Sequence, residues 1–265
     1  MPEVTVRFYE ELNRFLPDAR RKQPFAEAVP PGSTTKSLIE NLGVPHTEVD
    51  LVLVNGESAD FSRKLADGDV VSVYPVFESW DVGVVSRVRT IPLRVTRFIA
   101  DVHLGRLARL LRMMGFDTEW ANHLPDDLIV STARREGRIV LSRDRGLLKR
   151  RAVTHGCLVN SLEPREQLAE ILARFDLSRQ VRLFSRCMDC NVVLARVSRT
   201  SVLDALPPSV AETCSEFSRC PRCGKVFWRG THWETMKRLA ADVLGRHPQK
   251  PADLPRAAPD PPEGM

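Results

Sequence analysis

The sequence predicts three folded parts: a small α+β unit over residues 1–77, a parallel α/β domain over 95–182, and a cysteine-rich ribbon with a following helix over 183–245. Three observations support this division. Short strands and tight turns fill the first part, strands alternate with helices in the second, and two Cys-x-x-Cys pairs mark the third. We expect residues 78–94 to be a linker and residues 246–265, rich in proline and charge, to be a disordered tail.

The first part combines several short strands with one helix. Asn55-Gly56 follows an apolar run and is a strong hairpin signal, because both residue types tolerate a positive φ. The expected elements are strands over Val4–Phe8, Leu51–Val54 and Val70–Tyr74, and a helix from a Ser33 or Thr34 cap through Asn41 to Gly43. This pattern predicts a small β-grasp-like α+β fold.

The second part alternates strands and helices in short steps, which predicts a parallel sheet. Its first helix is amphipathic, ends at Gly115, and places on one face Leu104, Leu107, Ala108, Leu111 and Met114. The expected strands are Phe98–Ala100, Thr118–Ala121, Ile139–Leu141 and Leu158–Val159. The later helices are expected from Asp126 or Asp127 to Gly137, over Gly146–Arg151, and over residues 164–175.

The third part contains two potential metal-binding turns, Cys187-Met188-Asp189-Cys190 and Cys220-Pro221-Arg222-Cys223. Each turn places two sulfurs on one side of an ion, and two turns complete a tetrahedron. The following residues, Asn191 and Gly224, are types that tolerate the positive φ of a tight metal-binding knuckle. We therefore predict a structural Zn²⁺ ion on Cys187, Cys190, Cys220 and Cys223. A redox dithiol is the alternative for a single Cys-x-x-Cys pair.

Acidic residues follow two of the expected strands. Asp101 ends one strand, Asp144 comes just after another, and Asp126 and Asp127 begin the intervening helix. Ligands of open α/β sheets bind beyond the carboxyl ends of the strands, and clustered carboxylates are typical ligands of Mg²⁺ or Mn²⁺. Each acid also has a simpler explanation, as a helix cap, a first-turn charge or a partner of a neighbouring arginine.

Basic residues accompany these acids. Arg106, Arg109 and Arg112 recur at spacing three, and further basic residues surround Asp144. Guanidinium groups beside a metal site suit a phosphate backbone, so we assign substrate binding to Arg106, Arg109 and Arg143. For Arg112 and Arg134 we expect a solvated helix face instead.

The composition of the 265 residues is that of a globular protein, with 43% apolar residues and a net charge of +5. A basic chain favours acidic partners such as nucleic acid, although a solvated arginine-rich surface explains the charge equally well. The N-terminus lacks the pattern of a signal peptide, and no apolar run approaches the length of a membrane helix. We expect a cytoplasmic protein without membrane contact, whose cysteines bind metal rather than form disulfides.

The motifs resemble two related families. The second and third parts look like the Mut7-C RNase domain, through Arg97–Asp101, Leu104–Arg109, Leu111–Asp117, Ala133–Arg138, Leu141–Asp144, both cysteine pairs and Gly230–Glu234. The first part resembles the ubiquitin-like domain that is fused ahead of it. Through Val54–Gly56 and Leu65–Val71 it is also similar to sulfur-carrier proteins, but it lacks their C-terminal Gly-Gly, so carrier chemistry is not expected.

The resemblance implies a PIN-like nuclease fold that holds Mg²⁺ or Mn²⁺ on three or four acids and cuts RNA. Carried onto this chain, these acids are Asp101, Asp126 or Asp127, and Asp144. We predict a metal-dependent ribonuclease that carries an accessory domain over residues 1–77, with a protein partner for that domain as one option. The alternatives are a non-catalytic RNA- or ribosome-binding adaptor and a nucleotide-binding domain. The latter lacks a glycine-rich loop after Asp101.

Overall fold

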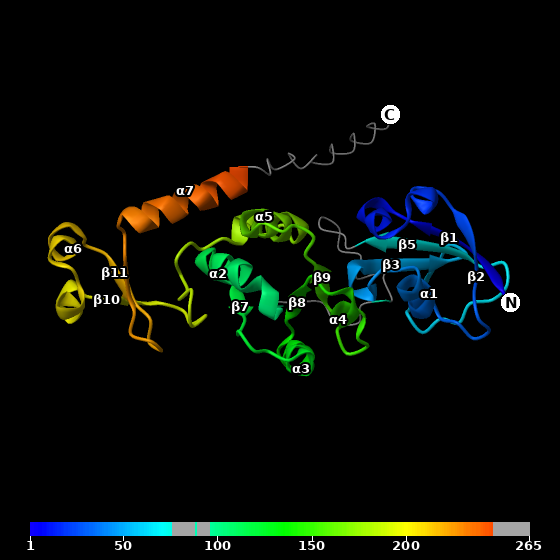
Figure 1. Ribbon diagram of the computed structural model, residues 1–265, viewed down its shortest axis with the longest axis horizontal. Helices are drawn as coiled ribbons and strands as arrows, with labels where there is room; N and C mark the ends of the chain where they lie inside the picture. Colours follow the sequence, from blue (N-terminus) through cyan, green and yellow to red (C-terminus); the bar gives the residue numbers. More distant parts are fainter. Residues whose placement is uncertain (76–87, 89–95, 246–265) are drawn as a thin grey trace, which may run out of the picture.

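The computed structural model describes residues 1–75, 88 and 96–245. Figure 1 shows three parts along the long axis, with the N-terminal domain at one end, the parallel α/β domain in the middle and the cysteine-rich part at the other end. The linker predicted over 78–94, apart from residue 88, and the tail predicted over 246–265 lie outside the described residues.

The N-terminal domain is a five-stranded mixed sheet with one α-helix, as a β-grasp fold requires. Its elements are β1 (Glu3–Phe8), η1 (Glu10–Phe15), η2 (Asp18–Arg20), β2 (Phe25–Ala28), α1 (Thr35–Asn41), η3 (His46–Glu48), β3 (Val49–Val54), β4 (Glu57–Ala59) and β5 (Val70–Pro75). The strand order is β2-β1-β5-β3-β4, with β1 and β5 parallel. Thr34 begins α1 in a capping box with Ser37. Asn55 and Gly56 turn the β3–β4 hairpin with φ values of 53° and 84°, which confirms the hairpin prediction.

The middle domain is a four-stranded parallel sheet between two layers of helices. Its elements are β6 (Arg97–Ala100), η5 (Val102–Leu104), α2 (Gly105–Met113), β7 (Asp117–Glu119), α3 (Asp126–Glu136), β8 (Ile139–Ser142), α4 (Arg145–Lys149), β9 (Gly156–Leu158), α5 (Pro164–Arg174) and η6 (Ser178–Gln180). The strand order β7-β6-β8-β9 places the change of winding direction between β6 and β8. Parallel α/β sheets bind ligands at such a switch point.

The predicted apolar face of α2 is buried, and Gly115 ends this helix with φ 99°. Several details of the prediction are wrong. Helix α4 ends at Lys149 rather than Arg151, and β9 spans Gly156–Leu158 rather than Leu158–Val159. Strand β7 ends at Glu119 rather than Ala121. The N-cap of α3 is Pro125, with φ −60°, and no side chain caps this helix, so Asp126 and Asp127 occupy its first turn. Proline fits there because its φ is fixed near this value and a helix start does not need its missing N–H.

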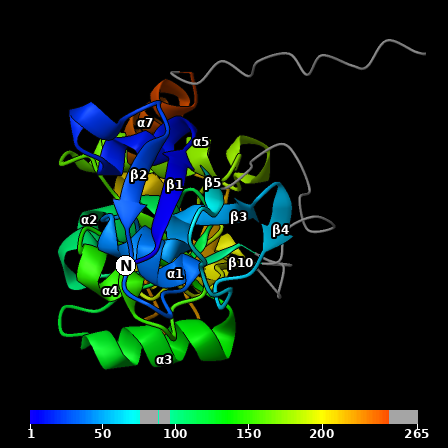
Figure 2. The same ribbon diagram turned by 90° about the vertical axis from the view of Figure 1, so that its right-hand side faces the viewer.

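The two faces of the parallel sheet belong to different cores. Phe98 and Leu141 point into one core with α2, α5 and α7 (Thr231–Gly245), whereas Ile99 and Val140 point into the other. This second core continues through α3 and α4 into the interior of the β-grasp domain. The two domains therefore share one hydrophobic core. Figure 2 shows the chain from the side of the N-terminal domain.

The cysteine-rich part is built on a three-stranded antiparallel sheet of β10 (Ala195–Val197), β11 (Phe217–Arg219) and β12 (Val226–Trp228). Between β10 and β11 the chain forms η7 (Arg199–Ser201), η8 (Leu203–Ala205) and α6 (Pro208–Thr213). Helix α7 then leads back and packs on α5, where Ala240 and Val243 are buried (Figure 1). Among the helices of residues 1–75 and 96–245, none combines the length and hydropathy needed to cross a bilayer.

Candidate functional site

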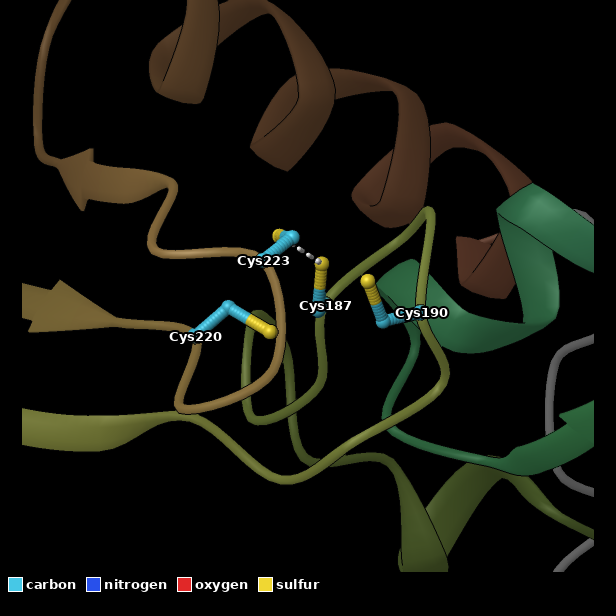
Figure 3. Close-up of side chains that lie close together, drawn as sticks. All are labelled: Cys187, Cys190, Cys220 and Cys223. Carbon is cyan, nitrogen blue, oxygen red and sulfur yellow. Dashed lines mark hydrogen bonds between the residues drawn. The ribbon is translucent and has the colours of Figure 1, made fainter.

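The four cysteines of the two Cys-x-x-Cys pairs meet at one point (Figure 3). All four sulfurs lie within 4.8 Å of one another, and the Sγ atoms of Cys187 and Cys223 are 3.8 Å apart. Four sulfurs at about 2.3 Å from a tetrahedral Zn²⁺ ion would be about 3.8 Å from one another. The donor set therefore fits a Zn²⁺ ion and leaves no coordination position open, as in structural zinc sites.

Both pairs form the same backbone turn, which orients the sulfurs. In the first, the N–H of Cys187 donates to the carbonyl of Val192 at 2.8 Å and the N–H of Asn191 donates to Cys187 at 2.9 Å. The second repeats these bonds with Cys220, Lys225 and Gly224. Asn191 has φ 62° and Gly224 has φ 74°, which confirms the positive φ predicted at both positions.

Without a cation, the close approach of the four sulfur atoms makes it unfavourable for all of them to carry a negative charge. A hydrogen bond shared with Cys223 raises the pKa of Cys190 to about 12. At Cys220, burial raises the pKa, but N–H donors of Cys223 and Arg222 outweigh burial and lower the pKa to about 7. Metal binding requires every thiol to lose its proton, and the charge of a divalent cation offsets the repulsion between the resulting thiolates.

Hydrogen bonds from Arg112 link the first cysteine turn to helix α2. Its guanidinium donates to the carbonyls of Thr118, Met188 and Asp189 at 2.8, 3.0 and 3.0 Å, and the residue is only 3% exposed. Burial lowers the pKa of Arg112. The expectation of a solvated Arg112 is therefore wrong, because the turn presents carbonyl groups that need a donor. Arg112 does not share the exposed face of Arg106 and Arg109.

Asn191 ties the same turn to strand β7. Its side chain accepts from the N–H of Thr118 at 3.0 Å and donates to Asp117 at 2.7 Å. Asp117 also pairs with Arg138 at 2.7 Å. In the sequence, the choice of Asn rather than Gly after Cys190 is the one sign of this arrangement.

At the switch point, Ser142 links the two strand-end acids. Its hydroxyl donates to Oδ2 of Asp101 at 2.8 Å and accepts from the N–H of Asp144 at 2.9 Å. The N–H of Asp101 donates to the carbonyl of Leu141 at 2.9 Å, so the two strands are in register. Asp101 is 8% exposed, whereas Asp144 is open to solvent. Ser142 was missed because its role depends on the pairing of β6 with β8.

Both acids also cap short helices. Oδ1 of Asp101 accepts from the N–H of Val102 at 2.6 Å, and Oδ1 of Asp144 accepts from Gly146 at 2.7 Å. The cap by Asp101 was its simpler explanation, whereas for Asp144 the simpler explanation was a pair with Arg143 or Arg145 rather than a cap. A capping bond occupies one lone pair of a carboxylate and leaves others for a cation, and metal-binding carboxylates are commonly hydrogen-bonded in this way.

Asp126 and Asp127 do not join that pair. Asp127 points to the guanidinium of Arg150 and is 88% exposed, and Asp126 is also exposed. Within residues 1–75 and 96–245, the four cysteines form a group of potential metal ligands within 4.8 Å of one another, and the four acids do not. The structure thus brings Asp101 and Asp144 together and leaves the α3 acids apart.

The predicted phosphate-binding arginines are exposed but have different surroundings. Arg109 pairs with Asp189 of the first cysteine turn at 3.3 Å. Arg106 and Arg143 lie open to solvent near Asp101 and Asp144 in the sequence. Other basic residues near Asp144 contact the β-grasp domain: the guanidinium of Arg145 lies over the ring of Phe15, and Lys149 donates to the carbonyl of Glu40 at 2.6 Å.

These features define a class of protein: a parallel α/β domain with two acids at its switch point, a four-cysteine ribbon and a β-grasp domain in front. The family described as Mut7-C RNAse domain matches residues 96–240, and the one described as Mut7-C ubiquitin matches residues 1–81. The chain belongs to the Mut7-C RNAse domain family.

A relative from Homo sapiens, exonuclease mut-7 homolog, is 27% identical over 179 residues, which are 64% of this chain but 18% of that protein. Two solved structures of small archaeal modifier protein 1 from Haloferax volcanii are similar at 19% and 17% identity. Each covers 29% of this chain, over 100% and 99% of its own length, with a TM-score of 0.24.

Proposed function

We propose that this protein is a metal-dependent ribonuclease that hydrolyses phosphodiester bonds of RNA at the carboxyl ends of β6 and β8. The observation that carries the proposal is the Asp101–Ser142–Asp144 arrangement at the switch point. Membership of a family described as an RNAse domain, and the likeness to a human exonuclease homolog, support it.

Asp101 and Asp144 would hold one Mg²⁺ or Mn²⁺ ion, since both present carboxylate oxygens, the ligands these ions prefer. Such an ion supplies an activated water and stabilises the charge of the reacting phosphate. The hydroxyl of Ser142 holds one oxygen of Asp101 in place and fixes the start of the turn that carries Asp144. Asp126 and Asp127 remain as proposed contributors through orientation of water, from the first turn of α3.

Arg106, Arg109 and Arg143 would bind phosphates around that position. The four-cysteine site would hold Zn²⁺ and keep β7, α2 and the ribbon together, because Arg112 and Asn191 link the first cysteine turn to both elements. Zinc on four thiolates has no open coordination position, so it would stabilise the fold rather than take part in catalysis.

The test is cleavage of a labelled single-stranded RNA by the purified full chain, with Mn²⁺, with Mg²⁺ and with EDTA. We expect cleavage with either metal, none with EDTA, and a loss of at least about a hundredfold in Asp144→Asn. Asparagine caps helices as well as aspartate, so this variant keeps α4 and removes the charge.

The matched control is Asp204→Asn, an exposed aspartate in η8 of the ribbon, which should cleave at the wild-type rate. Wild-type cleavage by Asp144→Asn would refute the assignment of this acid. Binding of RNA without any cleavage under all metal conditions would instead favour the non-catalytic adaptor.

A further inference from the structure

A hollow of about 700 Å³ lies between α3 and the segment that follows α4. It is lined by Asp127, Val130, Ser131, Arg134, Arg135, Arg150, Arg151 and Ala152. We call it the α3 groove. Its α3 residues occupy positions i, i+3, i+4, i+7 and i+8 of the helix, counted from Asp127, and therefore share one helix face.

The charge of the α3 groove is strongly positive, because four arginines face one aspartate. In the described part of the chain, Arg134 and Arg151 make no hydrogen bond or ion pair. Asp127 engages Arg150, yet Nη1 of Arg150 is buried and has no hydrogen-bond partner among the described residues. The groove thus offers guanidinium donors that the protein itself does not use, above a floor that includes Val130 and Ala152.

The position of the α3 groove relates it to the acids. Arg150 is the C-cap of α4 and Asp144 is its N-cap, so one five-residue helix of about 8 Å separates the groove from the proposed metal ligand. On α3, the stretch from Asp127 to Arg134 is about 10 Å long, enough to follow an extended polymer rather than a single phosphate.

We infer that the α3 groove binds the phosphodiester backbone of the RNA strand and leads it to Asp144. Guanidinium groups suit phosphate oxygens because their paired N–H donors match them in geometry and charge. The inference rests on the proposed ribonuclease function and extends it to Arg134, for which the sequence predicted a solvated helix face. Asp127 then acts as the residue that orients Arg150.

The test measures binding of a labelled single-stranded RNA to the full chain in EDTA, where no cleavage interferes. The variant Arg134→Ala/Arg151→Ala removes two exposed arginines that make no hydrogen bond or ion pair among the described residues, so its thermal midpoint should equal that of wild type. We expect affinity to fall at least about tenfold and the slope of log K against log salt to decrease by about 1.4, since each phosphate contact on a single strand contributes about 0.7.

The matched control, Arg165→Ala/Arg179→Ala, removes the same charge. It changes exposed arginines of α5 and η6, where α5 belongs to the core on the opposite face of the sheet. Its affinity and salt slope should stay within about twofold and about 0.3 of wild type. Equal losses in both double variants, or unchanged binding in Arg134→Ala/Arg151→Ala, would overturn the inference.

Competition distinguishes an RNA strand from a free phosphate ligand. Unlabelled RNA should displace the labelled strand at micromolar concentration, whereas adenosine monophosphate or inorganic phosphate should not at the same phosphate concentration. Equal displacement by the monophosphate would contradict a strand-binding groove. If Arg134→Ala/Arg151→Ala loses binding while wild type never cleaves with Mn²⁺, the groove stands and the ribonuclease proposal fails.

Discussion

Oε1 of Glu48 accepts the backbone N–H of Leu158 at 2.6 Å, across the boundary between the β-grasp domain and the parallel sheet. Leu158 belongs to β9, the edge strand, and its N–H points away from β8. Glu48 is completely buried and also pairs with Arg14 at 3.1 Å and Arg174 at 2.7 Å. A carboxylate of the first domain therefore completes the sheet edge of the second.

We predict that Glu48→Ala destabilises the protein by about 3–5 kcal/mol. The change removes the acceptor of the N–H of Leu158 and the carboxylate that lies 2.7 Å from Arg174, whose ion pair with Glu11 is longer, at 3.7 Å. Breaking a buried ion pair on one side has a cost of this size. Urea unfolding followed by circular dichroism measures it. Glu57→Ala, in the exposed start of β4, is the control and should change stability by less than about 0.5 kcal/mol. A loss below 1 kcal/mol in Glu48→Ala would show that the domains do not depend on this contact.

The sequence predicted the helix and three of the five strands of the β-grasp domain, without β2 and β4, but not the contact between the two domains. Local signals located the Thr34 cap, the Asn55-Gly56 turn and the glycine stops at Gly115 and Gly137, because a cap or turn depends on a few neighbouring residues. Glu48 and Leu158 are 110 residues apart, and a lone glutamate before a strand carries no signal for its distant partner. The shared core of the two domains was unpredictable for the same reason.

The candidate site likewise contains features that the sequence predicted and features that depend on contacts between distant residues. The cysteines were predictable because a metal-binding turn has a fixed spacing and a residue of positive φ after it. The proximity of Asp101 to Asp144 follows from the rule on strand ends, but Ser142 and the pairing of Asp127 with Arg150 depend on side-chain geometry that spacing does not determine. Arg112 shows the limit of helix-face reasoning, since a cationic residue at the end of α2 is buried by carbonyl groups of a distant turn.

Removal of zinc should unfold the cysteine-rich part and loosen β7 and α2. Purified protein should contain about one zinc ion per chain, and binding free energy at such sites is folding free energy. Treatment with a strong chelator should lower the thermal midpoint by more than 10 °C, reversibly on addition of Zn²⁺. Cys187→Ser should show the low midpoint without a chelator. Cys157→Ser changes a buried cysteine outside the cluster and should retain the metal, while a metal-free protein of unchanged midpoint would exclude a structural zinc site.

Replacement of Asn191 should separate its backbone conformation from its hydrogen bonds. Asn191→Gly keeps the positive φ but loses the bonds to Thr118 and Asp117, so we expect a loss of about 1–3 kcal/mol. Asn191→Ala should lose about 1 kcal/mol more, because alanine is strained at φ 62°. Gly224→Ala, at φ 74° with only side-chain atoms of Arg219 near the new methyl group, should show the conformational cost alone. Equal stability of the glycine and alanine variants at 191 would contradict this division.

Asp117 should make the free energy of unfolding depend on pH in the acidic range. Burial raises the pKa of this carboxyl, but hydrogen bonds from Arg138 and Asn191 and the charge of Arg186 outweigh burial and lower the pKa below its ordinary value. The folded state therefore binds the proton less readily than the unfolded state. The stabilisation is fully present above the unfolded pKa of about 3.9 and is lost as the pH falls through the lower folded value.

Asp117→Asn should be less stable than wild type by about 2 kcal/mol at pH 6, and this difference should shrink as the pH falls below about 4. Urea unfolding at pH 6, 5, 4 and 3 measures it, with Asp204→Asn as a control of constant difference. A difference for Asp117→Asn that stays constant over this range would mean that the carboxylate charge does not contribute to the link between β7 and the cysteine turn.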